Sequence, residues 1–415
     1  MKMSWEDESR STVEMLRSKK SGLQVIMNKR HNYSLRSQAI RPFKAMTVLA
    51  RANQLETEGR SVIHLEVGQP DFPVLEPIVS AASAAISQNK AGYSDANGLP
   101  ALRLKIAQYY ADYYGLNIDE RRIIITAGAS GALALVAALL TDPGDGWLLT
   151  DPGYPSNRTF IEAFSGVPQF CPVGPETRFQ LSAAQAAECW QASTKNLLLA
   201  SPANPTGTSL DQENLADLAG LVASRGGHLV SDEIYQGLEY GSTSRLSALS
   251  VDHQAFVINS FSKFFGMTGW RLGWLVAPED AIDSLIRFAQ NLFICASVPA
   301  QHGAVAAFNS GVLDQLHRQR DILQTRRDFV LAELPGVGLS VPITPDGAFY
   351  VYAKLPNDAP ACEDYCQTLL ELTGVAITPG TDFGDHNATR YIRLSYAQPQ
   401  HQLEQALERL AGFRP

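Results

Sequence analysis

Short apolar runs alternate with helix-like stretches over most of this chain. The apolar runs are about four to six residues long, rich in branched aliphatic residues, and do not alternate polar with apolar positions. This pattern is typical of parallel strands that are covered on both faces. Each run ends in small or turn-forming residues, and the five predicted strands lie in RRIIITAG (121–128), GWLLTDPGYP (146–155), NLLLASPANPTG (196–207), GHLVSDEIY (227–235) and AFVINSFSK (255–263).

Helix-like segments such as 130–140 and 211–226 separate these runs. Alternating β and α units predict an α/β fold with a mostly parallel sheet and helices on both faces. The pattern changes from about residue 312, where a long charged helix at 313–334 precedes three short β-rich runs and a last helix. This final part predicts a smaller α+β domain.

Composition narrows the function classes. The chain has 415 residues, of which 45% are hydrophobic and 18% charged, which is enough for two domains with large cores. The net charge of −8 argues against a nucleic-acid partner. No apolar run is long enough to predict a membrane span.

The N-terminal segment mixes acids and bases without an apolar stretch, so we expect no secretory signal. The five cysteines are odd in number and scattered, which is typical of a reduced, cytoplasmic protein. Cys362 and Cys366 are four residues apart, but no matching His or Cys pair lies nearby, and we expect no metal site.

Unusual polar residues follow the predicted strands, where parallel sheets bind ligands. Gly128, Ala129 and Ser130 join a strand to a helix, and the free N–H groups of such a turn favour an anion such as phosphate. Many βα turns look the same, so this signal is weak alone. The hydroxyls of Ser260 and Ser262 and the guanidinium of Arg271 could complete a phosphate site.

Lys263 is the one amine in the run NSFSKFFGMTGWRLGW (259–274). Asp232 follows a buried strand and could be a helix cap, Asn204 could be a plain turn residue, and Tyr154 could be a core aromatic. Taken together, an amine, a buried acid, an aromatic ring, Tyr235 and a phosphate site suit pyridoxal 5′-phosphate (PLP), whose enzymes pair a Schiff-base lysine with an acid at the ring nitrogen. Asp151-Pro152 and Asn204-Pro205 are candidate cis bonds.

The chain resembles the fold-type I PLP-dependent aminotransferases of class I and II, the group of the aspartate and alanine aminotransferases, over about residues 36 to 412. The motifs that carry the resemblance stand in the family's order and spacing: VGQPDF, YSDANGLPALR, SPANPTGT, SDEIY, SFSKFFGMTGWRLGW and RLSYA. The resemblance implies a seven-stranded sheet in a large domain at 72–315, a small domain from both chain ends at 36–71 and 316–415, and an N-terminal arm at 1–35, whose polar composition is typical of disordered tails.

The resemblance also implies residue roles. Lys263 would form the Schiff base and carry the proton, Asp232 would pair with the pyridine nitrogen, Tyr235 and Asn204 would bind the ring hydroxyl, and Tyr154 would stack on the ring. The phosphate would be held by Ala129, Ser130, Ser260, Ser262 and Arg271.

Three further positions complete the implied site. Arg393 would bind the substrate α-carboxylate, with a backbone contact from Gly68 and a further substrate contact from Asn204. Tyr93 would reach the phosphate of a neighbouring subunit, which implies a homodimer with shared active sites. The implied activity is ping-pong transfer of an amino group between an L-amino acid and a 2-oxo acid.

The chain departs from the aspartate-specific pattern. Some relatives place a lysine at the position of Ser130, others have an arginine in the region that reads NLFICASVP (291–299) here, and Asn157 replaces a common histidine. Without a cation for a second carboxylate, we expect a neutral amino acid such as alanine, with Phe43, Met46 and Phe349 as candidate pocket walls. Elimination of a sulfur amino acid on the same fold is one alternative, and a PLP-sensing regulator is another, although the segment before the match is too short and too mixed in charge for a DNA-binding domain.

Overall fold

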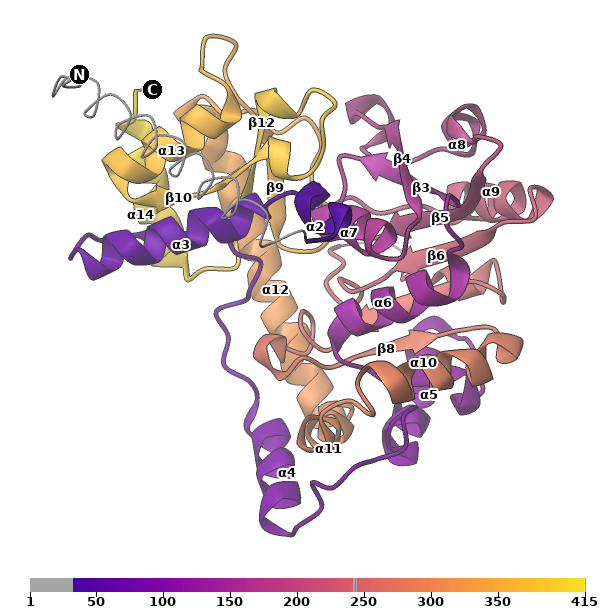
Figure 1. Ribbon diagram of the computed structural model, residues 1–415. Helices are drawn as coiled ribbons and strands as arrows, with labels where there is room; N and C mark the ends of the chain where they lie inside the picture. Colours follow the sequence, from indigo (N-terminus) through magenta and orange to yellow (C-terminus); the bar gives the residue numbers. More distant parts are fainter. Residues whose placement is uncertain (1–32, 242, 244, 415) are drawn as a thin grey trace, which may run out of the picture. The chain divides into compact units, whose positions relative to one another are not determined.

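The computed structural model describes residues 33–241, 243 and 245–414 (Figure 1). Most of the predicted arm at 1–35 lies outside the described residues. The part described before Pro42 belongs to a separate compact unit and contains helix α2 (Leu35–Ala39). Ser34 caps this helix, because its hydroxyl accepts the N–H of Ser37 at 3.3 Å.

The unit from Pro42 to the C-terminus is built on a seven-stranded sheet with the order β2-β8-β7-β6-β5-β3-β4. Six strands run parallel, and only β8 is antiparallel to its neighbours β2 and β7. The predicted strands are confirmed, while β4 and β8 were not predicted. The strands are β2 (Ile123–Thr126), β3 (Gly146–Asp151), β4 (Val167–Pro172), β5 (Thr194–Ala200), β6 (His228–Asp232), β7 (Phe256–Ser260) and β8 (Gly273–Val276).

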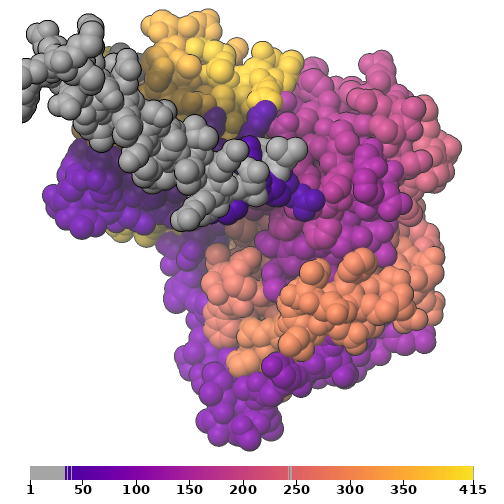
Figure 2. All heavy atoms as spheres, viewed as in Figure 1, coloured from indigo at the N-terminus to yellow at the C-terminus, as the bar shows by residue number. Residues whose placement is uncertain are grey.

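Helices cover both faces of this sheet because successive strand residues point to opposite sides. Ile124 of β2 belongs to one core cluster, whereas Ile123 and Ile125 belong to another. On the Ile124 side the core includes residues of α6 (Gly128–Leu140), α7 (Pro155–Ala163) and α10 (Ile282–Leu292). The other side is covered by α5 (Pro100–Tyr114), α8 (Ala183–Cys189), α9 (Gln212–Ser224) and α11 (Val298–Ala307), against which α4 (Glu76–Ser87) packs. The orange surface of α10 faces solvent in Figure 2.

Two small sheets are built from both ends of this unit. Strand β1 (Ile63–His64) pairs in parallel with β10 (Val375–Ala376). Strand β12 (Tyr391–Ser395) lies antiparallel between β11 (Thr378–Pro379) and β9 (Tyr350–Lys354). The helices of this region are α3 (Lys44–Thr57), α12 (Ser310–Glu333), α13 (Cys362–Thr373) and α14 (Gln400–Ala411). The smaller α+β part from both chain ends is therefore confirmed. The boundaries at 72 and 316 stay a prediction, and the second falls within α12.

Short 3-10 turns connect these elements at Glu120–Arg122, Pro175–Thr177, Ala248–Ser250, Thr268–Trp270, Glu279–Ala281, Leu334–Val337, Gly380–Asp382 and Ala388–Arg390. The two predicted cis bonds, Asp151-Pro152 and Asn204-Pro205, are cis, and Ser201-Pro202 is cis as well. None of the helices in the described part of the chain combines enough length and apolar character to cross a membrane. The described residues also contain no group of three His, Cys, Asp or Glu side chains that could hold a metal.

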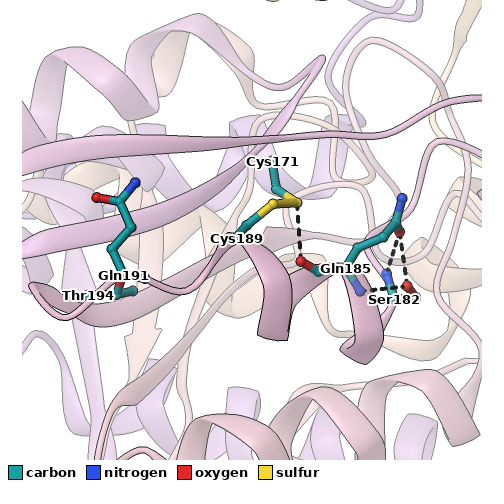
Figure 3. The surroundings of a disulfide bond; sticks show 6 residues. All are labelled: Cys171, Ser182, Gln185, Cys189, Gln191 and Thr194. Atoms are coloured by element: carbon teal, nitrogen blue, oxygen red, sulfur yellow. Dashed lines mark hydrogen bonds between the residues drawn. A yellow bond between two sulfur atoms is a disulfide. The ribbon is translucent and has the colours of Figure 1, made fainter.

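A disulfide joins Cys171 of β4 to Cys189 at the end of α8 (Figure 3). The expectation that all cysteines are reduced is therefore wrong for this pair. Sequence spacing could not show the pair, because the two cysteines are 18 positions apart and meet only when α8 packs on β4. The other three cysteines, Cys295, Cys362 and Cys366, are free.

We predict that the unfolded, unreduced protein exposes three reactive thiols out of five. Reduction should release two more and lower the free energy of unfolding by about 2–4 kcal/mol, because the crosslink restricts the unfolded chain. Thiol titration in denaturant with and without reductant measures this. Five thiols before reduction would contradict the pairing.

Candidate active site

The carboxyl ends of three neighbouring strands meet at one edge of the large sheet. In the register of the parallel pairs, Ala200 of β5 lies opposite Asp232 of β6, which in turn lies opposite Ile258 of β7. Ser260 ends β7 two residues later, opposite Gly273 of β8. The sequence-predicted polar residues therefore emerge at a common edge, where parallel sheets hold their ligands.

An anion cradle forms where the N-terminus of α6 approaches β8. Gly128 has φ of +70°, and a Cβ on it would lie 2.8 Å from a terminal nitrogen of Arg271. A Cβ on Gly273 would lie 2.9 Å from the Ala129 nitrogen. Glycine at position 128 leaves room for the Arg271 guanidinium, and glycine at position 273 lets β8 lie against the N-terminus of α6. Ala129 is half-buried, and Ser130 is exposed beside it.

Two serine hydroxyls, one at the end of β7 and one just after it, lie next to this cradle. The Ser260 hydroxyl donates to the Ser262 hydroxyl at 2.9 Å and accepts the Ser262 N–H at 3.0 Å. Arg271 has a left-handed backbone with φ of +53° and donates to the Thr268 carbonyl at 3.1 Å. Two hydroxyls and a guanidinium thus flank the helix N-terminus, a donor set that suits a phosphate.

The Lys263 amine points across the same edge. Its Nζ donates to the Gly68 carbonyl at 2.7 Å and lies 5.7 Å from the ring centres of both Tyr235 and Phe349. Burial lowers the pKa of Lys263 to about 8, and the positive charges of Arg393 and Arg271 act in the same direction. A lowered pKa leaves part of the amine neutral, and therefore nucleophilic, near pH 7–8.

Asp232 is a buried acid at the end of β6. Its Oδ1 accepts the N–H of Ile234 at 3.3 Å. Burial raises the pKa of Asp232 to about 7, and the Ile234 N–H and the Lys263 amine oppose that rise. A cationic or N–H group of a ligand would therefore stabilise the ionised form of this buried carboxyl.

Aromatic rings surround the amine and the acid. The hydroxyls of Tyr235 and Tyr350 share a hydrogen bond of 2.9 Å. A Cβ on Gly68 would lie 1.7 Å from the Tyr350 hydroxyl, so a larger residue at this position would displace the Tyr350 ring. The Tyr154 ring meets Phe43 edge to face, with 6.1 Å between ring centres. Burial also raises the pKa of Tyr154, which keeps its hydroxyl protonated.

Arg393 of β12 is buried among neutral acceptors. It donates to Asn204 Oδ1 at 2.9 Å, to Thr378 Oγ1 at 3.3 Å, and to the Glu66 carbonyl. Its guanidinium also lies 4.3 Å from the Tyr350 ring centre. The Arg393 Nε has no partner among the described residues. A buried cation with neutral acceptors and a spare donor suits a carboxylate ligand.

Tyr93, a sequence-predicted site residue, lies largely at the surface. It is 84% exposed, whereas Asp232, Asn204 and Arg393 are buried. The charges of Arg393, Arg271 and Asp232 all act on the Lys263 amine.

The sequence model of the family described as "Aminotransferase class I and II" matches residues 60–410. The chain belongs to this family. Class I and II aminotransferases use PLP, so this aminotransferase is a PLP-dependent transaminase.

Relatives and solved structures agree with this assignment. The chain is 38% identical to the "Valine--pyruvate aminotransferase" of Mycobacterium tuberculosis over 90% of its own length and 96% of that protein, and 30% identical to the "Aspartate aminotransferase" of Bacillus subtilis over 91% and 98%. It superposes with a TM-score of 0.89 on a crystal structure of an aminotransferase from M. tuberculosis, at 36% identity, covering 92% and 98% of the two chains. The structure of an aspartate aminotransferase from Thermus thermophilus with maleate superposes with a TM-score of 0.87 at 32% identity, covering 92% of this chain and 99% of that one.

The residues of this aminotransferase fit the cofactor. PLP supplies an aldehyde that takes up the amino group and a pyridine ring that draws electrons from the substrate. The cradle beside Arg271 has donors for its phosphate, Lys263 offers an amine, and Asp232 offers a buried acid.

Several residues near the site were not found from the sequence. Tyr350 contacts Tyr235 and Arg393, Phe383 lies 4.8 Å from the Arg393 guanidinium, and Thr378 and Glu66 accept from it. All four come from the two chain ends, which reach the large sheet only through tertiary folding. Glu66 lies two residues before Gly68 in the VGQPDF region, which was the only signal that could have drawn attention to it.

Glu233 lies behind Asp232 and was also missed. Its Oε1 accepts from the hydroxyls of Ser231 and Ser247, each at 3.1 Å, and from the N–H of Ala248 at 2.7 Å. Its backbone N–H donates to the Ile258 carbonyl at 2.8 Å. Burial raises the pKa of Glu233 to about 8. This side chain therefore anchors the turn after β6 in its protonated form at neutral pH.

We predict that Glu233→Gln makes stability less sensitive to pH. An unfolded Glu loses its proton near pH 4.5, whereas native Glu233 keeps it up to about pH 8, so between these values the unfolded state binds fewer protons and the free energy of unfolding falls as pH rises. The Gln variant lacks this contribution. Because one unit of pKa shift corresponds to about 1.4 kcal/mol, the effect should reach a few kcal/mol.

Urea unfolding at pH 5, 6, 7 and 8 measures this difference. Glu408→Gln, at a solvent-exposed position, is the control. Parallel stability profiles for wild type and Glu233→Gln would contradict the raised pKa.

Proposed function

We propose that this aminotransferase takes a neutral L-amino acid, such as alanine or valine, as its amino donor. The buried guanidinium of Arg393 supports this, because it offers one site for the α-carboxylate that every amino acid and 2-oxo acid carries. Neither Ser130 nor the segment 291–299 supplies a cation for a second carboxylate. The name of the M. tuberculosis relative, a valine–pyruvate aminotransferase, points the same way, while the B. subtilis relative is named for aspartate.

In this proposal each residue has a defined task. Lys263 holds the cofactor through its amine. Once the substrate has released this amine, its Nζ accepts the proton from the substrate Cα. Asp232 keeps a proton on the ring nitrogen, which a buried carboxylate does strongly. Tyr235 and Asn204 donate to the ring hydroxyl, and Tyr154 covers the ring face.

The phosphate is held by the cradle described above. Its proposed donors are the α6 N-terminus at Ala129 and Ser130, the hydroxyls of Ser260 and Ser262, and the Arg271 guanidinium. Gly68 gives its carbonyl to the Lys263 amine and a backbone contact to the substrate, and Arg393 with Asn204 holds the carboxylate. Since both substrates carry this carboxylate, the same groups serve the two half-reactions in turn.

We further propose a homodimer with shared active sites. Tyr93, at 84% exposure, is free to meet another subunit. Ile86, Leu292 and Ile294 are also more than half exposed, and large exposed apolar side chains often mark subunit contacts. We also propose a cytoplasmic location, in which the Cys171–Cys189 disulfide would be an unusual feature.

We predict that Lys263→Ala abolishes transamination and the absorbance band of the bound cofactor near about 420 nm. Turnover should fall by at least about a thousandfold, because the side chain both attaches the cofactor and moves the proton. Coupled product assays and absorbance spectra of the purified proteins measure this. Lys195→Ala, at an exposed lysine on β5, should behave as the wild type. Near-normal turnover in Lys263→Ala would refute the assignment.

We predict that alanine and valine convert the band at about 420 nm to one near about 330 nm, whereas aspartate does so at least about tenfold more weakly. The expected preference follows from the cost of burying a second carboxylate without a cation. Titration of the spectrum with single amino acids measures it. Stronger conversion by aspartate would refute the neutral preference and leave the transaminase assignment intact.

A further inference from the structure

The segment from Glu66 to Phe72 runs over the Lys263 amine. Two of its carbonyls contact the site directly: that of Gly68 accepts from Lys263 Nζ at 2.7 Å, and that of Glu66 accepts from Arg393. This segment has no regular secondary structure between β1 and α4. Because backbone atoms make both contacts, their positions depend on how the segment is held rather than on its own side chains.

An ion pair fastens the end of this segment to α12. Arg326 donates to the two carboxylate oxygens of Asp71 at 2.6 and 3.0 Å, a paired geometry that fixes orientation. The side chains are only 9% and 18% exposed. The Arg326 guanidinium also lies 5.1 Å from the centre of the Phe72 ring. The Asp71 N–H donates to the Ala397 carbonyl at 3.0 Å, so the same residue is tied to the end of β12.

Residues of the 66–72 segment and of α12 line one small cavity together with Lys263. Pro70 and Phe72 line a cavity of about 10 Å³ together with Lys263 and Leu323 of α12. That is room for about one water molecule. Leu323 lies one helical turn before Arg326, so a shift of the pair would move the wall of the cavity that the lysine side chain also lines.

A plain stabilising contact would not require this arrangement. A largely buried ion pair costs much of what it gains, and an apolar pair of similar size often stabilises a fold as well. What charges add is a fixed direction and register. Here they fix the position of the segment that contacts Lys263 and Arg393 through its backbone.

We propose that Asp71 and Arg326 are positioning residues that hold the 66–72 segment against Lys263, keeping the Gly68 carbonyl on the amine and bulk water away from it. The inference rests on the proposed role of Lys263. Neither residue touches the amine, so both act through the backbone of the segment.

The test compares Arg326→Gln and Asp71→Asn with the wild-type holoenzyme. Arg51→Gln is the matched control, because Arg51 makes a comparable two-bond pair with Glu371 at 2.6 and 2.9 Å between α3 and α13. The readouts are kcat and KM for an amino acid that the wild type converts, the unfolding temperature, and the pH midpoint of the absorbance change of the bound cofactor, which reports the proton on the Lys263 nitrogen.

We expect kcat/KM to fall about tenfold to a hundredfold in both variants, as misplacement of a reacting group by about 1 Å produces. The pH midpoint should move upward by about half a unit to one unit, because water admitted beside the Lys263 nitrogen favours its charged form. Arg326→Lys keeps the charge but loses the paired geometry, and should lie between the wild type and Arg326→Gln. Arg51→Gln should keep the wild-type midpoint and kcat/KM.

The outcomes are distinct. Variants that lower only the unfolding temperature, or that match Arg51→Gln in midpoint and kcat/KM, would overturn the inference. If Arg326→Gln does not fold, the pH midpoint of the cofactor absorbance in Asp71→Asn and Arg326→Lys provides the test instead. The role of Lys263 itself is tested separately. If the wild type shows no pH-dependent absorbance band, or if Lys263→Ala keeps that band, the role of Lys263 is refuted and this inference falls with it.

Discussion

Keeping the Lys263 amine out of water is the constraint on which the site depends. A buried amine is held in its charged form only at a cost, and here burial and two nearby arginines lower its pKa to about 8. The opposite shift at Asp232, whose pKa is raised to about 7, has the same origin. Both groups are thereby poised to exchange protons with a ligand near neutral pH, which neither would do on an open surface. The glycines at positions 68 and 128 follow from this constraint, because the groups that replace water must approach closely.

The sequence predicted those strands whose apolar runs match their burial in the folded sheet. The strands ending near Asp232 and Ser260 are buried on both faces, so their apolar runs were plain, and their polar ends could be read as a site. Strand β8 was missed because the GWRLGW segment reads as a turn-rich loop until it pairs with β2 and β7. Strand β4 has exposed ends and contains two prolines, which weakens its pattern.

Contacts between distant segments could not be predicted from local patterns. Tyr350 and Thr378 join the site only because β9, β11 and β12 fold back toward the large sheet. Likewise, Asp71 and Arg326 are 255 residues apart, and nothing in either neighbourhood identifies the other. The disulfide shows the same limit at short range, since an odd number of scattered cysteines says nothing about which two meet. In each case the missing information was geometric rather than chemical.

The construction of the small sheets from both chain ends has a consequence for synthesis. Arg393 donates to the carbonyl of Glu66 across a separation of 327 residues. During translation the large sheet can be complete while the segment that carries Arg393 is still inside the ribosome. The strand ends that carry Asp232 and Ser260 can therefore form before Arg393 is available to join them. The site gains its buried guanidinium only once β12 has paired with β9 and β11.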